Sequence, residues 1–72
     1  MTEAEGREIL LRFMQKITDK NYPLAWVGEI LIDDPEIFLF EATIHKENEN
    51  PRDDYMHWIV KKATGECGPD TA

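Results

Sequence analysis

The segment from Met56 to Glu66 constrains the fold more than any other part of this chain. Every second residue from Met56 to Val60 is apolar, which predicts a β-strand over Tyr55 to Lys62 with one apolar face. Lys62-Ala63-Thr64-Gly65-Glu66 then fits a type I turn followed by a glycine in the left-handed region, a common hairpin reversal. The chain is therefore expected to double back after this strand.

The N-terminal residues predict an amphipathic helix. Thr2 and Glu5 have the spacing of a capping box, with Thr2 as the N-cap. Gly6 projects near the middle of the apolar stripe and is expected to let the helix approach a sheet closely. The helix is predicted to end at Asn21-Tyr22-Pro23, because proline and the residue before it resist helical geometry. Five apolar residues share the stripe: Ile9, Leu10, Phe13, Met14 and Ile17.

Two more strands are predicted between the helix and Tyr55. The first covers about Ala25 to Ile32 and ends at the turn Asp33-Asp34-Pro35-Glu36; the second covers Ile37 to Lys46, and a polar loop follows it. Strict alternation assigns these side chains to the helix-facing side: Trp26, Gly28, Ile30, Ile32, Phe38, Phe40, Ala42, Ile44, Met56, Trp58 and Val60. The predicted fold class is therefore α+β, one N-terminal helix packed on a three-stranded antiparallel meander. Residues 1–66 form its single domain, and residues 67–72 form a short flexible tail or a brief edge strand.

One helix can cover only one face of such a sheet. The other face is expected to carry a substantially apolar set: Val27, Leu31, Ile37, Leu39, Tyr55 and Ile59. A half-solvated antiparallel sheet normally turns polar residues outward, and exposed apolar patches usually mark an interaction surface. The alternatives are that strand twist and the C-terminal tail cover part of this face, or that it forms a homodimer.

The charge of the chain is strongly negative, with 15 acidic and 8 basic residues among 72. The segment from Glu29 to Asp54 holds nine acidic and two basic residues, and so carries the whole formal charge of −7. Direct nucleic-acid binding is disfavoured, since phosphate recognition needs a basic surface, whereas a basic protein partner would be complementary. Simple solubility is the alternative explanation. The predicted partner-binding residues are Leu31, Ile37, Leu39, Tyr55, His57 and Ile59, with the acids Asp33, Asp34, Glu36, Glu41, Glu47, Glu49, Asp53 and Asp54.

No residue pattern predicts an enzyme or a cofactor. Glu41, His45 and His57 are the candidate ligands of a metal ion, on neighbouring strands of the outward face. Cys67 has no histidine near it in sequence and is read as an incidental thiol. A single cysteine cannot form an internal disulfide, and no apolar run approaches the ~20 residues of a membrane span, so we expect a cytoplasmic protein.

Two segments resemble the bacterial immunity protein 35 family. Ile37-Phe38-Leu39-Phe40-Glu41-Ala42 is similar to that family's aromatic strand, which ends in Phe-Glu-Ala. Trp58-Ile59-Val60-Lys61-Lys62-Ala63-Thr64-Gly65-Glu66 is similar to its later strand, which ends in Ser/Thr-Gly-Glu. The resemblance implies a protein that binds and neutralises a toxin in the producing cell. A phage-type inhibitor whose acids imitate phosphates, and a homodimeric structural module, are the alternative functions.

Overall fold

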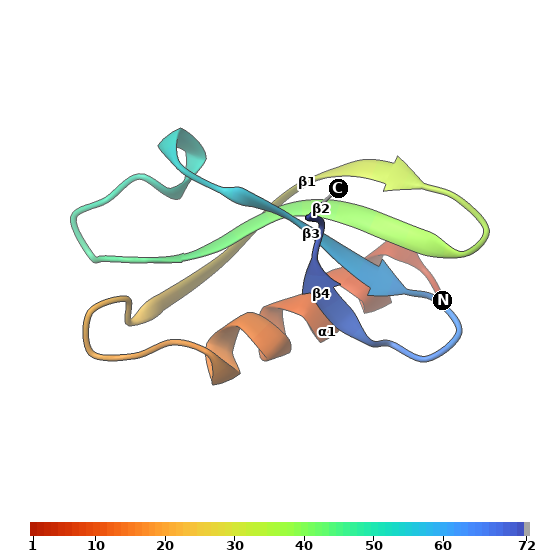
Figure 1. Ribbon diagram of the computed structural model, residues 1–72, viewed down its shortest axis with the longest axis horizontal. Coiled ribbons are helices and arrows are strands. Elements are labelled where there is room, and N and C mark those ends of the chain that lie inside the picture. The colour runs from red at the N-terminus through yellow and green to blue at the C-terminus, as the bar shows by residue number, and fades with distance from the viewer. Residues whose placement is uncertain (72) are drawn as a thin grey trace.

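The chain folds into one antiparallel sheet with a helix against one of its faces (Figure 1). The computed structural model describes residues 1–71. Within them the elements are α1 (Glu3–Lys16), β1 (Leu24–Asp33), β2 (Ile37–His45), the short 3-10 helix η1 (Pro51–Asp53), β3 (Met56–Lys61) and β4 (Cys67–Pro69). The strands lie in the order β1-β2-β3-β4. The α+β prediction is thus confirmed, but the described part of the sheet has four strands where three were predicted.

The fourth strand arises from the turn that Gly65 makes. Gly65 has a φ of 75°, and its N–H donates to the carbonyl oxygen of Lys61 at 2.7 Å. The chain therefore reverses as predicted, and Cys67, Gly68 and Pro69 pair with β3. Of the two alternatives predicted for residues 67–72, a brief edge strand is confirmed for Cys67–Pro69, because this hairpin supplies backbone partners for it, and the flexible tail is wrong for these three residues. Residue 72 lies outside the described residues.

The start of α1 agrees with the predicted capping box. The N–H of Glu5 donates to Oγ1 of Thr2 at 3.2 Å, and the N–H of Thr2 donates to Oε1 of Glu5 at 2.8 Å. Gly6, Leu10 and Met14 are buried along the predicted stripe. A Cβ built on Gly6 would lie 2.6 Å from the ring of Phe38, so the missing side chain lets α1 lie directly on β2.

The end of α1 differs from the prediction. The helix stops at Lys16, about a turn before the expected Asn21-Tyr22-Pro23. Ile17 is the C-cap, and the N–H groups of Asn21 and Tyr22 donate to the side chain of Asp19, each at 2.8 Å. These side-chain bonds satisfy the backbone in a turn of its own, which competes with a further helical turn.

The core lies between α1 and the inner face of the sheet, which is the face that α1 covers. Its buried members come from the helix and from β2 and β3, with the predicted side-chain register: Leu10, Met14, Phe38, Phe40, Ala42, Trp58 and Val60. The orientation of β2 and β3 is therefore confirmed, except that Met56 at the start of β3, predicted to be turned into the core, is 52% exposed.

The facing of β1 was predicted wrongly. Ala25 and Val27 lie opposite Ile44 and Ala42 on the inner face, whereas Trp26 lies opposite Thr43 on the outer face, the one turned away from α1. The pairing with β2 then slips by one residue between Val27 and Ile30, and again between Ile30 and Ile32. Each slip is a bulge that places two β1 residues opposite one β2 residue. Ile30 therefore remains inward, while Ile32 lies opposite Leu39 and faces outward, against the strict alternation.

Candidate functional site on the outer face of the sheet

The outer face carries a partly exposed apolar surface that agrees in part with the predicted one. Leu31 and Ile32, in the second bulge of β1, are 44% and 43% exposed, and Tyr55 is 37% exposed. Ile59 is half-buried. Leu39 is only 7% exposed, since it lies on a central strand with Ile32 and Ile59 opposite it on either side. Leu39 thus faces outward as predicted but is buried. The predicted outward facing of Val27 is wrong, because Val27 lies opposite the buried Ala42.

Three rings form a row across the outer face. The ring centroids of Trp26 and Tyr55 lie 6.1 Å apart, and those of Tyr55 and His57 lie 6.0 Å apart. Trp26 is on β1 and Tyr55 directly precedes β3, so their backbones are separated by β2 and by roughly 9.5 Å. The two rings must therefore lean toward each other over β2. We call Trp26, Tyr55 and His57 the aromatic row.

Two carboxylates lie beside this row. The first bulge of β1 places Gly28 and Glu29 opposite Glu41 of β2, and Glu41 lies opposite His57 of β3. The N–H of Glu29 donates to Oε1 of Glu41 at 3.3 Å. A hydrogen bond to the Glu41 carboxylate, together with its negative charge, raises the pKa of the Tyr55 phenol. Glu41 thus connects β1 to the aromatic row.

A helix residue supports the bulge from the other side. Nη1 of Arg7 donates to the carbonyl oxygens of Val27 at 3.2 Å and Gly28 at 2.5 Å. The Arg7 guanidinium also lies 5.2 Å from the centroid of the Phe40 ring. A Cβ built on Gly28 would lie 2.2 Å from the Trp26 ring, so the indole lies directly against this glycine. Arg7 therefore holds the backbone on which Trp26 rests.

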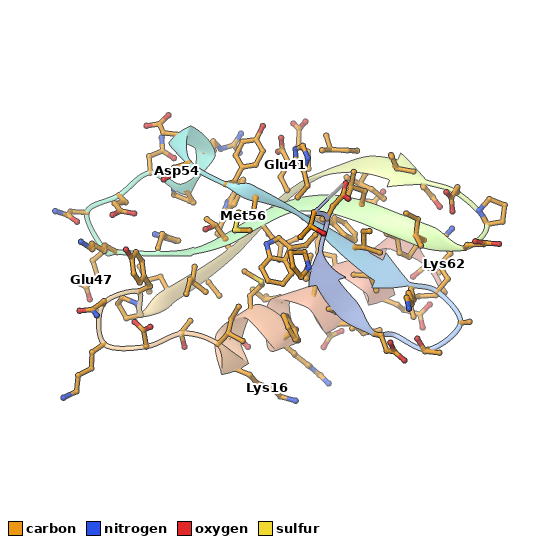
Figure 2. All side chains as sticks on the ribbon, viewed as in Figure 1. Lys16, Glu41, Glu47, Asp54, Met56 and Lys62 are labelled. Carbon is orange, nitrogen blue, oxygen red and sulfur yellow. The ribbon has the colours of Figure 1, made fainter. Side chains whose placement is uncertain are left out.

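The predicted acids do not gather into one patch. Figure 2 shows Glu47 and Asp54 toward one end of the molecule, Glu41 near its middle and Lys62 toward the other end. The longest dimension of the chain is 36 Å, so the two end groups are well separated. Glu49 and Asp53 belong to the same connection between β2 and β3 as Glu47 and Asp54, and all four are exposed.

The acids of the β1–β2 turn have structural partners. Asp33 forms an ion pair with Lys62, whose Nζ also lies 4.3 Å from the centroid of the Phe38 ring. The Asp34 carboxylate accepts the N–H groups of Ile37 and Glu36, each at 2.8 Å, and these bonds lower its pKa. Both acids thus stabilise the turn.

A shallow groove lies at the same end of the molecule as this turn. It has a volume of about 380 Å³ and includes the predicted partner-binding residues Glu36 and Ile37. Ile37 lies opposite Lys61, four residues along β2 from the pair formed by Glu41 and His57. The groove is therefore separate from the aromatic row. Its full lining is Pro35, Glu36, Ile37, Lys61, Ala63 and Thr64.

The three candidate metal ligands are not brought together. Glu41 lies opposite His57. His45 lies at the far end of β2, opposite Leu24. Its Nδ1 is 2.8 Å from the carbonyl oxygen of Lys46. Among residues 1–71, no group of three histidine, cysteine or acidic side chains could hold a metal ion. Cys67 is partly buried, and this burial raises the pKa of its thiol, which disfavours the thiolate that a nucleophile requires.

Comparison with known proteins gives no family assignment. No family model, curated protein or solved structure matches the chain. In the described part of the chain, no helix has the length and apolarity needed to cross a membrane.

Proposed function

We propose that this chain is a small binding domain that uses the outer face of its sheet to bind a protein partner with a basic surface. The observation that carries the proposal is the aromatic row beside Glu29 and Glu41. Tryptophan and tyrosine are enriched among the residues that dominate binding energies at protein interfaces. Carboxylates at such a surface favour a partner of opposite charge and discourage partners of like charge.

The apolar residues of the second bulge extend the same surface. Leu31 and Ile32 are exposed on β1, while α1 lies against the opposite face of the sheet. A partner that covered them together with Tyr55 would remove apolar area from water. The acids at both ends of the sheet would then accelerate encounter with a basic partner through their long-range field.

The biological form of this binding that we propose is inhibition, in which the domain covers and neutralises a basic protein. The resemblance to the immunity protein 35 family supports this form. The loop acids Glu47 and Asp54 lie toward one end of the molecule, and Asp33 lies beside Lys62 toward the other. The aromatic row, and not phosphate imitation, is therefore the centre of the proposal.

A pair of matched variants tests the surface. Ile32→Lys places a positive charge on the outer face, and Ile17→Lys places the same charge at the end of α1, on a residue that is 37% exposed. The immobilised chain and both variants are incubated with a lysate of the source cells, and the dissociation constants of captured proteins are then measured with purified material. We expect the wild-type chain to capture a basic protein. This protein should bind wild type and the Ile17→Lys variant with equal affinity, and the Ile32→Lys variant about tenfold more weakly.

Three results would contradict the proposal. One is that no basic protein is captured, and another is that Ile17→Lys weakens binding as much as Ile32→Lys does. The third is self-association of the chain through this face. Light scattering would then show a mass that rises with protein concentration, and the Ile32→Lys variant would have the mass of a monomer.

A further inference from the structure

We propose that the surface formed by Trp26, Tyr55 and Glu41 is a binding site for a guanidinium group, supplied by an arginine side chain of the partner. This inference rests on the proposed function and names the chemistry of its central contact.

The rings of the aromatic row lack an internal cation, although other rings of the chain have one. Residues 1–71 contain three such contacts. Arg7 lies 5.2 Å from the centroid of the Phe40 ring. Lys46 lies 5.6 Å from that of Tyr22, and Lys62 lies 4.3 Å from that of Phe38. No such contact involves Trp26 or Tyr55 in this part of the chain. Aromatic faces attract cations, and tryptophan does so most strongly. The two rings therefore retain an unused capacity for a cation from outside.

The neighbouring carboxylates also lack an internal cation. The ion pairs of the described chain use Glu3, Glu8, Asp33 and Glu66 as their acids, and neither Glu29 nor Glu41 takes part in one. Glu41 is partly buried, and its carboxylate accepts hydrogen bonds from the N–H of Glu29 and from the Tyr55 phenol, neither of which carries a positive charge. Two uncompensated negative charges thus lie beside two rings that attract cations.

A guanidinium fits this combination better than an ammonium does. It is planar and weakly hydrated, it stacks on aromatic rings, and its fork of N–H groups pairs with a carboxylate at two points. The planes of Trp26 and Tyr55 meet at 49°, so the rings do not stack face to face, and Tyr55 remains 37% exposed. Since the Tyr55 phenol is hydrogen-bonded to Glu41, a flat cation on the exposed part of the Tyr55 ring would lie next to this carboxylate.

The indole N–H signals of the two tryptophans can show on which face the ligand binds, because the two residues lie on opposite faces of the sheet. Trp26 is on the outer face, and Trp58 is on the inner face with 8% of its surface exposed. The probe is acetyl-Gly-Arg-Gly-amide, titrated into the ¹⁵N-labelled whole chain in 150 mM salt while both indole N–H signals are followed. We expect a saturable shift of the Trp26 signal and an unchanged Trp58 signal.

Two further peptides test the chemical class of the ligand. Citrulline replaces arginine with a neutral group of nearly the same shape, and lysine replaces it with an ammonium. We expect the citrulline peptide to bind about tenfold more weakly and the lysine peptide to bind more weakly than the arginine peptide. Equal binding of arginine and citrulline, equal binding of arginine and lysine, or no shift at Trp26 would each overturn the inference.

A charge-neutralising variant tests the role of Glu41. Glu41→Gln keeps the shape of the side chain, and we expect it to weaken arginine-peptide binding roughly fivefold. Glu8→Gln on the exposed side of α1 is the matched control and should leave binding unchanged. An equal effect of the two variants would overturn the inference. The Trp58 signal reports in each case that the core is intact.

Two combinations of results separate the guanidinium site from the proposed binding face. If the arginine peptide does not shift Trp26 but Ile32→Lys still disrupts partner binding, the guanidinium site is wrong and the binding face stands. If the peptide binds but partner binding is unaffected by Ile32→Lys, this surface binds a guanidinium, but the partner does not use the outer face and the proposed function is wrong.

Discussion

Nη1 of Arg7 on α1 lies 2.5 Å from the carbonyl oxygen of Gly28 in the first bulge of β1. This hydrogen bond joins the helix on the inner face to the strand segment that presents Trp26 and Glu29 on the outer face. Bulges commonly redirect side chains near functional sites. The geometry of the aromatic row therefore depends on a residue that contacts none of its rings in the interactions described above.

Replacing Arg7 with lysine should loosen the bulge. Lysine keeps the positive charge but loses the planar fork, so we expect a loss of about 1–2 kcal/mol in the free energy of unfolding and a shift of the Trp26 indole signal. Urea unfolding and NMR measure the two effects. The control is Glu3→Gln, which removes the exposed ion pair at 3.6 Å and one acidic charge from the first turn of α1, and should cost less than about 1 kcal/mol. If both variants lost the same free energy of unfolding, the hydrogen bonds from Arg7 to the carbonyl oxygens of Val27 and Gly28 would contribute little to stability.

Gly65→Ala should destabilise the β3–β4 hairpin. A residue with a Cβ at a φ of 75° is strained by roughly 1–2 kcal/mol, so we expect a melting temperature lower by about 4–16 °C. Gly68→Ala in β4 is the matched control, since a Cβ there would meet no atom within 4 Å and φ is not positive. Thermal unfolding by circular dichroism compares the two. Equal melting temperatures for the two variants would refute the importance of this turn.

Gly6→Ala should also be destabilising, even though alanine favours a helix by about 1 kcal/mol relative to glycine. The added methyl group would lie 2.6 Å from the Phe38 ring, and overpacking of this kind typically costs about 1–3 kcal/mol. In a Phe38→Leu background the same change should cost less, because the smaller side chain leaves room. Urea unfolding of the four proteins gives the coupling energy between the two sites. Stabilisation by Gly6→Ala alone would show that α1 can move away from the sheet without cost.

The turn carboxylate of Asp34 should make stability depend on pH. The N–H groups of Ile37 and Glu36 lower its pKa from the ordinary value of 3.8. A carboxyl with a lower pKa in the folded chain adds stability above its unfolded pKa and loses that stability as the pH falls through the folded pKa. Asp34→Ala should therefore lower the melting temperature at pH 7, and the difference from wild type should shrink as the pH falls below 3.8. Glu47→Ala removes the same charge from an exposed loop and should show no such difference at pH 7.

The sequence was sufficient to predict the helix, β2 and β3, because each has strong local signals. Thr2 and Glu5 mark the start of α1. Apolar residues at every second position mark the inner face of each strand: Phe38, Phe40 and Ala42 in β2, and Met56, Trp58 and Val60 in β3. The β4 strand was harder to predict, since glycine and proline at positions 68 and 69 disfavour a strand locally. The pairing with β3 outweighs that preference.

The facing of β1 could not be predicted because its local pattern is ambiguous. Both Trp26 and its neighbours Ala25 and Val27 are apolar, so alternation fits either orientation. The bulges then depend on tertiary contacts, above all on Arg7, which is 20 residues from Val27 in sequence. Trp26 and Arg7 were therefore missed from the site, whereas Leu31 and Tyr55 are exposed as predicted.

The most direct test of the central claim is a map of the surface that a basic ligand contacts on the whole chain. A peptide selected against the chain from a random display library is titrated into the ¹⁵N-labelled protein, and every amide signal is followed. We predict an arginine-containing peptide that shifts Trp26, Ile32 and Tyr55 and leaves the exposed side of α1 unchanged. Selected peptides without basic residues, or shifts concentrated on α1, would contradict the assignment of the outer face as the binding surface.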